Sequence, residues 1–171
     1  LFDRVVLVPV AVDSTVVSDW ETGFAKDRIA VAIRRLAARG IVIGTNVTIA
    51  ILWGQGESDK TAGTTQTAYT NSLNAVIAAS RTAGFAGTWF VAKQTYISGA
   101  ASSAVQAAQA AVVNHGSGVW AGPDADALIG NTCNGSSACR QADVTHWTDA
   151  GSISYAAAWK TAMASFGAPY T

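Results

Sequence analysis

The alternation of short apolar runs with helix-forming segments is the feature that most constrains this chain. Four apolar runs, rich in β-branched residues, predict strands buried on both faces, at residues 4–12, 47–53, 88–92 and 118–121. Apolar residues recur at helical spacing in four other segments, at residues 29–39, 69–84, 102–114 and 148–166. Alternation of this kind forms a parallel sheet with helices on both faces. We therefore expect an α/β fold in three layers, α/β/α.

Length and charge limit the possible classes of protein. A chain of 171 residues fits one ordinary domain, and no repeat or linker divides residues 1–171. Eleven Lys and Arg residues balance eleven Asp and Glu residues. Nucleic acids and anionic membranes are held by an excess of positive charge, which this chain lacks. No apolar run reaches the roughly 18 residues that a membrane-spanning helix needs.

The segments that carry polar chemistry follow the predicted strands. In open parallel sheets, ligands bind at the edge formed by the carboxyl ends of the strands. Four loops are expected at that edge, at residues 13–20, 54–67, 94–101 and 122–146.

The segment ILWGQGESD, residues 51–59, has a strand that ends directly in a Gly-Gln-Gly turn. Gly54 and Gly56 allow a tight turn, and the Gln55 amide can donate to a developing oxyanion there. Glu57 and Asp59 can orient a histidine, but taken alone they are better explained as helix-capping or solvated carboxylates.

The segment DVTHWTDAG, residues 143–151, places an Asp three residues before a His. Asp143 can then bind Nδ1 of His146, which leaves Nε2 free to act as a general base. The spacing alone is common and weak evidence. The other histidine, His115, is most simply a cation at a helix C-terminus.

Two cysteines, Cys133 and Cys139, lie in a flexible Gly/Ser-rich segment. Five intervening residues allow a disulfide, which favours an extracellular or periplasmic location. A zinc site is a weaker interpretation, since no second cysteine pair and no His at ligand spacing accompany them. Two reduced thiols in a cytosolic protein are the alternative.

Together, the two polar segments resemble the SGNH hydrolases, in particular the sialate O-acetylesterase-like and acetylxylan esterase-like carbohydrate esterases. WGQGESD resembles the third sequence block of that branch, and DVTHWTDAG resembles the fifth. VLVPVAVDSTVVSDW, residues 6–20, is similar to the second block. The resemblance covers residues 5–159 and implies a flavodoxin-like sheet and a serine esterase that removes acetyl groups from carbohydrate, without a metal or an organic cofactor.

The resemblance also implies roles for single residues. His146 is the general base, Asp143 orients it, and Gln55 lies in the oxyanion hole. Glu57 resembles a second carboxylate that assists the histidine in some members. The turn after Val12 supplies a backbone oxyanion donor, although Asp13 and Ser14 stand where the family usually has two glycines.

The family's nucleophilic Ser belongs to a Gly-x-Ser block that follows a first strand, and both precede the segment that resembles the second block. Nothing before Leu1 is present in this sequence, which also starts without a Met. In the flavodoxin-like order, the missing strand lies between residues 5–12 and 47–53, and its absence leaves unpaired backbone groups. We therefore expect a companion polypeptide, or an N-terminal segment of the same gene product, that supplies this strand and its Ser.

Three alternatives remain open. Ser14 follows an Asp after a strand and is a rival nucleophile within the chain. A glycan-binding module that kept the fold without catalysis is the competing function from another class, and a structural scaffold is the third. The acetylated sugar, whether sialate, xylan or a bacterial surface glycan, is suggested by the resemblance alone.

Overall fold

The computed structural model describes residues 4–44 and 47–166, and it contains a parallel three-stranded sheet in the order β1-β2-β3. The strands are β1 (Ala50–Trp53), β2 (Thr88–Lys93) and β3 (Val119–Asp124). In register, Leu52 of β1 pairs with Phe90 of β2, and Phe90 pairs with Trp120 of β3. The predicted α/β class with a parallel sheet is confirmed. Leu1, before which we expect a further segment, lies outside the described residues.

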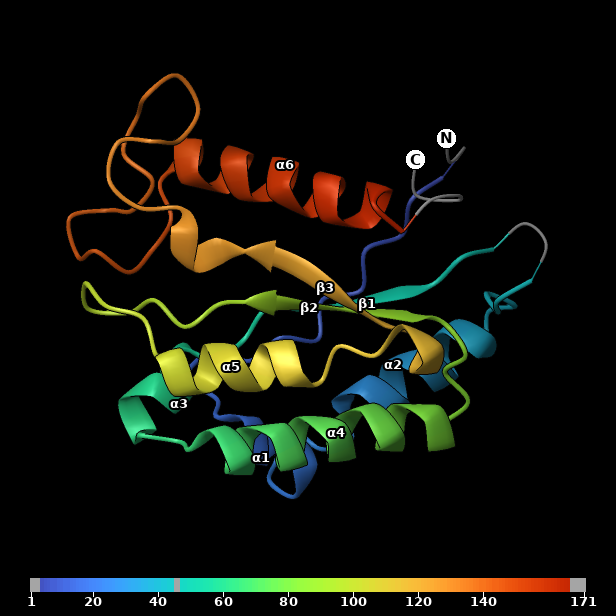
Figure 1. Ribbon diagram of the computed structural model, residues 1–171. Helices are drawn as coiled ribbons and strands as arrows, with labels where there is room; N and C mark the ends of the chain where they lie inside the picture. Colours follow the sequence, from blue (N-terminus) through green and yellow to red (C-terminus); the bar gives the residue numbers. More distant parts are fainter. Residues whose placement is uncertain (1–3, 45–46, 167–171) are drawn as a thin grey trace.

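Helices cover both faces of the sheet. In the described part of the chain they are α1 (Val17–Glu21), α2 (Arg28–Ala37), α3 (Glu57–Ala62), α4 (Gln66–Thr82), α5 (Ser103–Ala111) and α6 (Asp149–Ala164), with short 3₁₀ turns η1 (His115–Ser117) and η2 (Ala125–Ala127). Figure 1 shows α6 on one side of the sheet and α4 and α5 on the other, which gives the three layers. Side chains of Thr65, Ser102 and Thr148 cap the starts of α4, α5 and α6.

The main core lies between the sheet and the helices α1, α4 and α5. Trp53, Trp89 and Tyr69 are buried there. On the opposite face, Phe90 is buried beside Phe166 at the end of α6. Leu52, next to Phe90 on that face, remains 46% exposed because α6 packs on β3 and leaves β1 uncovered.

The strand predicted at residues 4–12 is wrong in this structure. The segment is irregular, and Leu7 is 85% exposed. Its apolar pattern is that of a buried strand, but a strand needs a hydrogen-bonded neighbour, and among the described residues no strand pairs with it. Arg28 Nε donates to the carbonyl of Val10 and holds the segment near α2.

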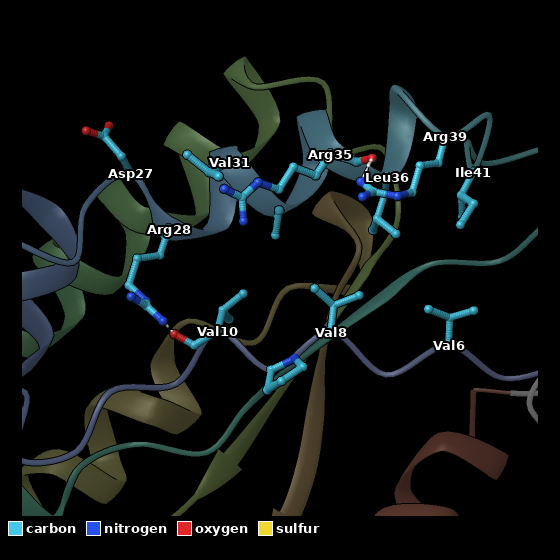
Figure 2. A pocket seen from close by; sticks show the side chains of 12 residues that line it. Val6, Val8, Val10, Asp27, Arg28, Val31, Arg35, Leu36, Arg39 and Ile41 are labelled. Atoms are coloured by element: carbon cyan, nitrogen blue, oxygen red, sulfur yellow. Dashed lines mark hydrogen bonds between the residues drawn. The ribbon is translucent and has the colours of Figure 1, made fainter.

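A groove separates this segment from the sheet. A cavity of about 750 Å³ lies between residues 6–10, α2 and residues 47–52. A second cavity, of about 540 Å³, continues it between residues 6–10 and α2. Figure 2 shows Val6, Val8 and Val10 on one side of that second cavity and Arg35 and Leu36 of α2 on the other, with Arg28 reaching from α2 to the carbonyl of Val10. The groove lies between the two segments that, by the family resemblance, flank a missing strand.

Candidate active site

The Gly-Gln-Gly turn connects the end of β1 to α3, as its sequence predicts. A Cβ atom at Gly56 would lie 2.3 Å from the carbonyl oxygen of Gln94, and one at Gly54 would lie 2.5 Å from Oε1 of Gln94. Gln94 follows β2, the neighbouring strand. Gly56 is therefore required because the end of β1 packs against the backbone after β2, whereas a side chain at Gly54 would displace the Gln94 side chain.

The side chain of Gln55 is fully engaged in hydrogen bonds. Its Nε2 donates to the carbonyl of Thr15 at 2.9 Å and to Oδ2 of Asp59 at 2.5 Å. The Tyr69 hydroxyl lies 2.9 Å from Oε1 of Gln55 and 2.7 Å from its backbone oxygen. With acceptors on one side of the amide and a donor on the other, its orientation is fixed. Donation to an oxyanion then requires Gln55 to release one of its two present acceptors.

The turn after Val12 lies directly against this amide. Ser14 has φ 59°, in the left-handed region that glycine favours, at a position where the resemblance implies a glycine. The Thr15 hydroxyl makes two hydrogen bonds: it donates to the carbonyl of Val12 and accepts the indole N–H of Trp20. Among the described residues, no hydrogen bond uses the backbone N–H groups of residues 13–15.

Asp143 and His146 form the contact that their spacing predicts. Nδ1 of His146 lies 2.6 Å from Oδ2 of Asp143, while Oδ1 accepts the backbone N–H groups of Thr145 and His146. The hydrogen bond from His146 is the main reason that the pKa of Asp143 falls to about 2. The same carboxylate raises the pKa of His146. The histidine side chain is 73% exposed, so its Nε2 faces open space.

Arg140 anchors the loop that carries His146. Its guanidinium donates to the backbone carbonyls of Thr145, Ala125 and Leu128 and lies 3.4 Å from the ring centre of Trp147. Tyr155 of α6 stacks on the same Trp147 ring. Burial lowers the pKa of Arg140. The two faces of Trp147 are thus occupied by protein side chains.

Glu57 lies in a separate, half-buried cluster. Its Oε1 accepts from Nε2 of Gln94 at 2.7 Å, its Oε2 accepts the backbone N–H of Gly56, and Gln94 in turn accepts from the Tyr155 hydroxyl. Burial raises the pKa of the Glu57 carboxyl, and the bond from Gln94 partly opposes this. Within the described chain, Glu57 makes no hydrogen bond to His146, and it connects to the loop of His146 through Gln94 and Tyr155, which stacks on Trp147.

The elements converge at one edge of the sheet. Gln55 Nε2 donates to the carbonyl of Thr15, so the turn at residues 13–15 lies against the Gly-Gln-Gly turn. Thr145 Oγ1 also accepts the backbone N–H of Ser98, from the loop after β2. In the described chain, Ser14 is exposed and makes no hydrogen bond to His146.

The predicted disulfide between Cys133 and Cys139 is present, and the Cα atoms are 5.2 Å apart. It closes a loop next to Arg140. Thr148 binds the carbonyl oxygen of Cys139 and so attaches this loop to the start of α6.

Asp59 is not a solvated carboxylate: it is fully buried and accepts three hydrogen bonds, one of them from the backbone N–H of Val17 at the start of α1. Sequence reasoning also missed Gln94, Arg140 and Tyr155. Their partners are backbone carbonyls, or side chains far away in the sequence, so no local spacing signals them.

Within residues 4–44 and 47–166, no group of His, Cys, Asp and Glu residues is arranged to hold a metal ion. No helix in this part of the chain is long and apolar enough to cross a membrane.

Comparison with known proteins places the chain in a family. Residues 2–121 match the family model described as carbohydrate esterase, sialic acid-specific acetylesterase. The match includes the turn at residues 13–15 and the Gly-Gln-Gly turn, and it ends before the loop of Asp143 and His146. No curated protein and no solved structure showed a significant match. The chain therefore belongs to the sialic acid-specific acetylesterase family of carbohydrate esterases.

Proposed function

We propose that this chain supplies the general base and the oxyanion-binding turn of a serine esterase that removes O-acetyl groups from carbohydrate. The observation that carries the proposal is the pair of Asp143 and His146, with Nδ1 held at 2.6 Å and Nε2 open. The loop of this pair contacts the loop after β2 through Thr145 and Ser98, and the turn at residues 13–15, whose backbone N–H groups make no hydrogen bond among the described residues, lies against Gln55. Membership of an acetylesterase family supports the reaction class.

The reaction follows from these groups. Nε2 of His146 takes the proton from a Ser hydroxyl as its oxygen attacks the acetyl carbonyl. Asp143 keeps the proton of the imidazole on Nδ1 and stabilises the imidazolium that forms. The backbone N–H groups of residues 13–15 stabilise the negative oxygen of the tetrahedral intermediate. Gln55, whose two N–H groups donate to Thr15 and Asp59, holds this turn in place. His146 then protonates the departing sugar oxygen, and water hydrolyses the acyl-enzyme to acetate by the reverse sequence of proton transfers.

The nucleophilic Ser is proposed to come from a companion segment. Its place is the groove between residues 6–10 and β1, where β1 has an edge without a strand partner in the described chain. Residues 47–52 line one side of the groove. In an extended conformation they span about 20 Å, which is the length of a short strand. An apolar strand that pairs with this edge would cover Leu52 and Val8, both exposed here, and would end at the same edge of the sheet as His146.

Backbone amide exchange tests this placement. Amides of residues 47–53 should exchange more slowly in the complete enzyme than in the isolated chain, while those of α5, which lies away from the groove, should change little. Equal exchange of residues 47–53 in the two preparations would contradict a strand in the groove.

Replacement of the histidine tests the activity. We expect His146→Ala to reduce hydrolysis of p-nitrophenyl acetate and of O-acetylated sugars by the complete enzyme by at least about 10³-fold, since the general base is lost. His115→Ala is the matched control, because His115 stacks on Trp120 beside the amino end of β3, away from the candidate site. Wild-type enzyme without hydrolytic activity, but with affinity for the glycan, would favour the non-catalytic module instead.

The choice among sialate, xylan and bacterial surface glycans is decided by comparing acetate release from each. We also propose an extracytoplasmic location, which the disulfide between Cys133 and Cys139 favours.

A further inference from the structure

Asp59 is a buried carboxylate to which the general-base mechanism assigns no role. Its side chain has no exposed surface. Oδ2 accepts the backbone N–H of Val17 at 2.8 Å and Nε2 of Gln55 at 2.5 Å, and Oδ1 accepts the Thr64 hydroxyl at 2.7 Å. The three donors come from the start of α1, the Gly-Gln-Gly turn and the loop before α4. One carboxylate therefore joins three separate segments.

A buried carboxylate is tolerated only when its oxygens are well satisfied. Among the described residues no cation forms an ion pair with Asp59, so its three hydrogen bonds offset the cost of burying the carboxylate. Hydrogen bonds to a charged acceptor are stronger than bonds between neutral groups. The position of Val17 and Gln55 relative to α3 is therefore tightly fixed.

These contacts hold the turn at residues 13–15 from its far side. Asp59 binds Val17 directly, and it binds Gln55, whose second N–H donates to the carbonyl of Thr15. The turn is thus held at two nearby backbone positions while its own N–H groups remain unpaired among the described residues. An oxyanion site needs this combination, because its donors must be rigid and free at the same time.

We propose that Asp59 is a positioning residue that fixes the oxyanion-binding turn, directly through Val17 and indirectly through Gln55. This inference rests on the proposed function for its effect on catalysis, while its effect on the turn can be measured without catalysis. In this account the Gln55 amide transmits the position of Asp59 to the turn.

Two variants separate positioning from simple folding stability. Asp59→Asn keeps the shape: its amide oxygen can accept from Val17 and Gln55, and its NH₂ can donate to the Thr64 hydroxyl, which also accepts. Asp59→Ala removes all three acceptors. Ser80→Ala is the control for loss of a buried polar contact, because Ser80 accepts the indole N–H of Trp89 near the far end of α4.

Amide exchange of the complete enzyme measures the turn itself. In Asp59→Ala we expect the Val17 amide to exchange more than about tenfold faster, because its acceptor is lost, while Leu73 in the middle of α4 is unchanged. Asp59→Asn should stay near wild type. Unchanged exchange at Val17, or an equal rise at Leu73, would overturn the proposal.

Kinetics of the complete enzyme measure the consequence. We expect Asp59→Ala to lower kcat by about 10²-fold with little change in KM, because a displaced oxyanion site affects the transition state alone. Asp59→Asn should restore most of kcat, and Ser80→Ala should leave it unchanged. A kcat of Asp59→Ala equal to that of wild type overturns the inference. If the wild-type enzyme does not hydrolyse esters, the proposed function fails, and the exchange data alone decide whether Asp59 fixes the turn.

Discussion

The two halves of the candidate site are built in opposite ways. The half around Gln55 is buried, comes from one continuous strand–turn–helix segment, and has its polar side chains engaged with Thr15, Asp59 and Tyr69. The half around His146 lies on an exposed loop, and its conformation depends on a local turn at Asp143 and on one buried cation, Arg140.

This difference indicates how each half responds to substitution of a single residue. Packing and many hydrogen bonds fix the Gln55 half. After a single substitution there, the remaining contacts limit how far the other side chains move. The His146 half has few contacts, and each of them sets the position of the imidazole. We therefore expect substitution of Asp143, which contacts the imidazole directly, to affect activity more than stability.

Asp143→Asn gives the largest expected effect. An Asn can bind Nδ1 but favours the wrong tautomer and no longer stabilises the imidazolium, so kcat should fall by on the order of 10²- to 10⁴-fold. The carboxylate raises the pKa of His146, so its loss should lower that pKa. The acid limb of the pH profile of kcat/KM, along which His146 loses its proton, should then move to lower pH. An unshifted limb would show that His146 is not the group that titrates.

Arg140→Lys gives an intermediate effect. A Lys cannot reach all three carbonyls, so the loop of His146 should loosen and kcat should fall about tenfold, with a loss of about 2 kcal/mol in the free energy of unfolding. Arg81→Lys is the matched control, because Arg81 also binds three carbonyls, those of Phe85, Gly87 and Ser117. We expect it to lose similar stability and to keep its kcat. Equal losses of kcat in both variants would mean that Arg140 acts only through stability.

Replacement of both Cys133 and Cys139 by Ser gives a smaller effect. The short loop that the disulfide closes predicts a loss of about 2 kcal/mol in the free energy of unfolding, on the model of unfolded-state entropy. Because Arg140 and Thr148 still hold the loop, kcat at a temperature well below Tm should change less than about threefold. Thermal unfolding and initial rates check the two parts, and a large loss of kcat would show that the disulfide positions His146.

Ser14→Ala should have the smallest effect. Ser14 is exposed, and in the described chain it makes no hydrogen bond to His146, so we expect kcat to stay within about twofold of wild type. Loss of activity with an intact fold by circular dichroism would identify Ser14 as the nucleophile within the chain.

Local patterns predicted most of the fold. The helical spacing around Tyr69 and the apolar run around Phe90 correspond to α4 and β2, since both elements are buried by neighbours within the chain. The run at residues 4–12 did not correspond to a strand, because an apolar pattern indicates burial but does not show whether a neighbouring strand pairs with it. The contact of Asp143 with His146 was predictable because the two residues are three positions apart.

Asp59 shows the limit of sequence reasoning at the site. Its partner Val17 is 42 positions away and binds through the backbone, which every residue possesses. The sequence did not indicate the role of Arg140 for the same reason, because Arg140 binds backbone carbonyl groups instead of a carboxylate in a recognisable motif.

Labelling with a fluorophosphonate probe tests whether His146 activates a serine that lies outside residues 1–171. In the complete enzyme, the probe should react with one serine outside residues 1–171, and His146→Ala should slow this reaction by at least about 10²-fold, because the serine loses its base. Mass spectrometry of the digested protein locates the modified residue. A label on Ser14, or a labelling rate that His146→Ala leaves unchanged, would contradict the account.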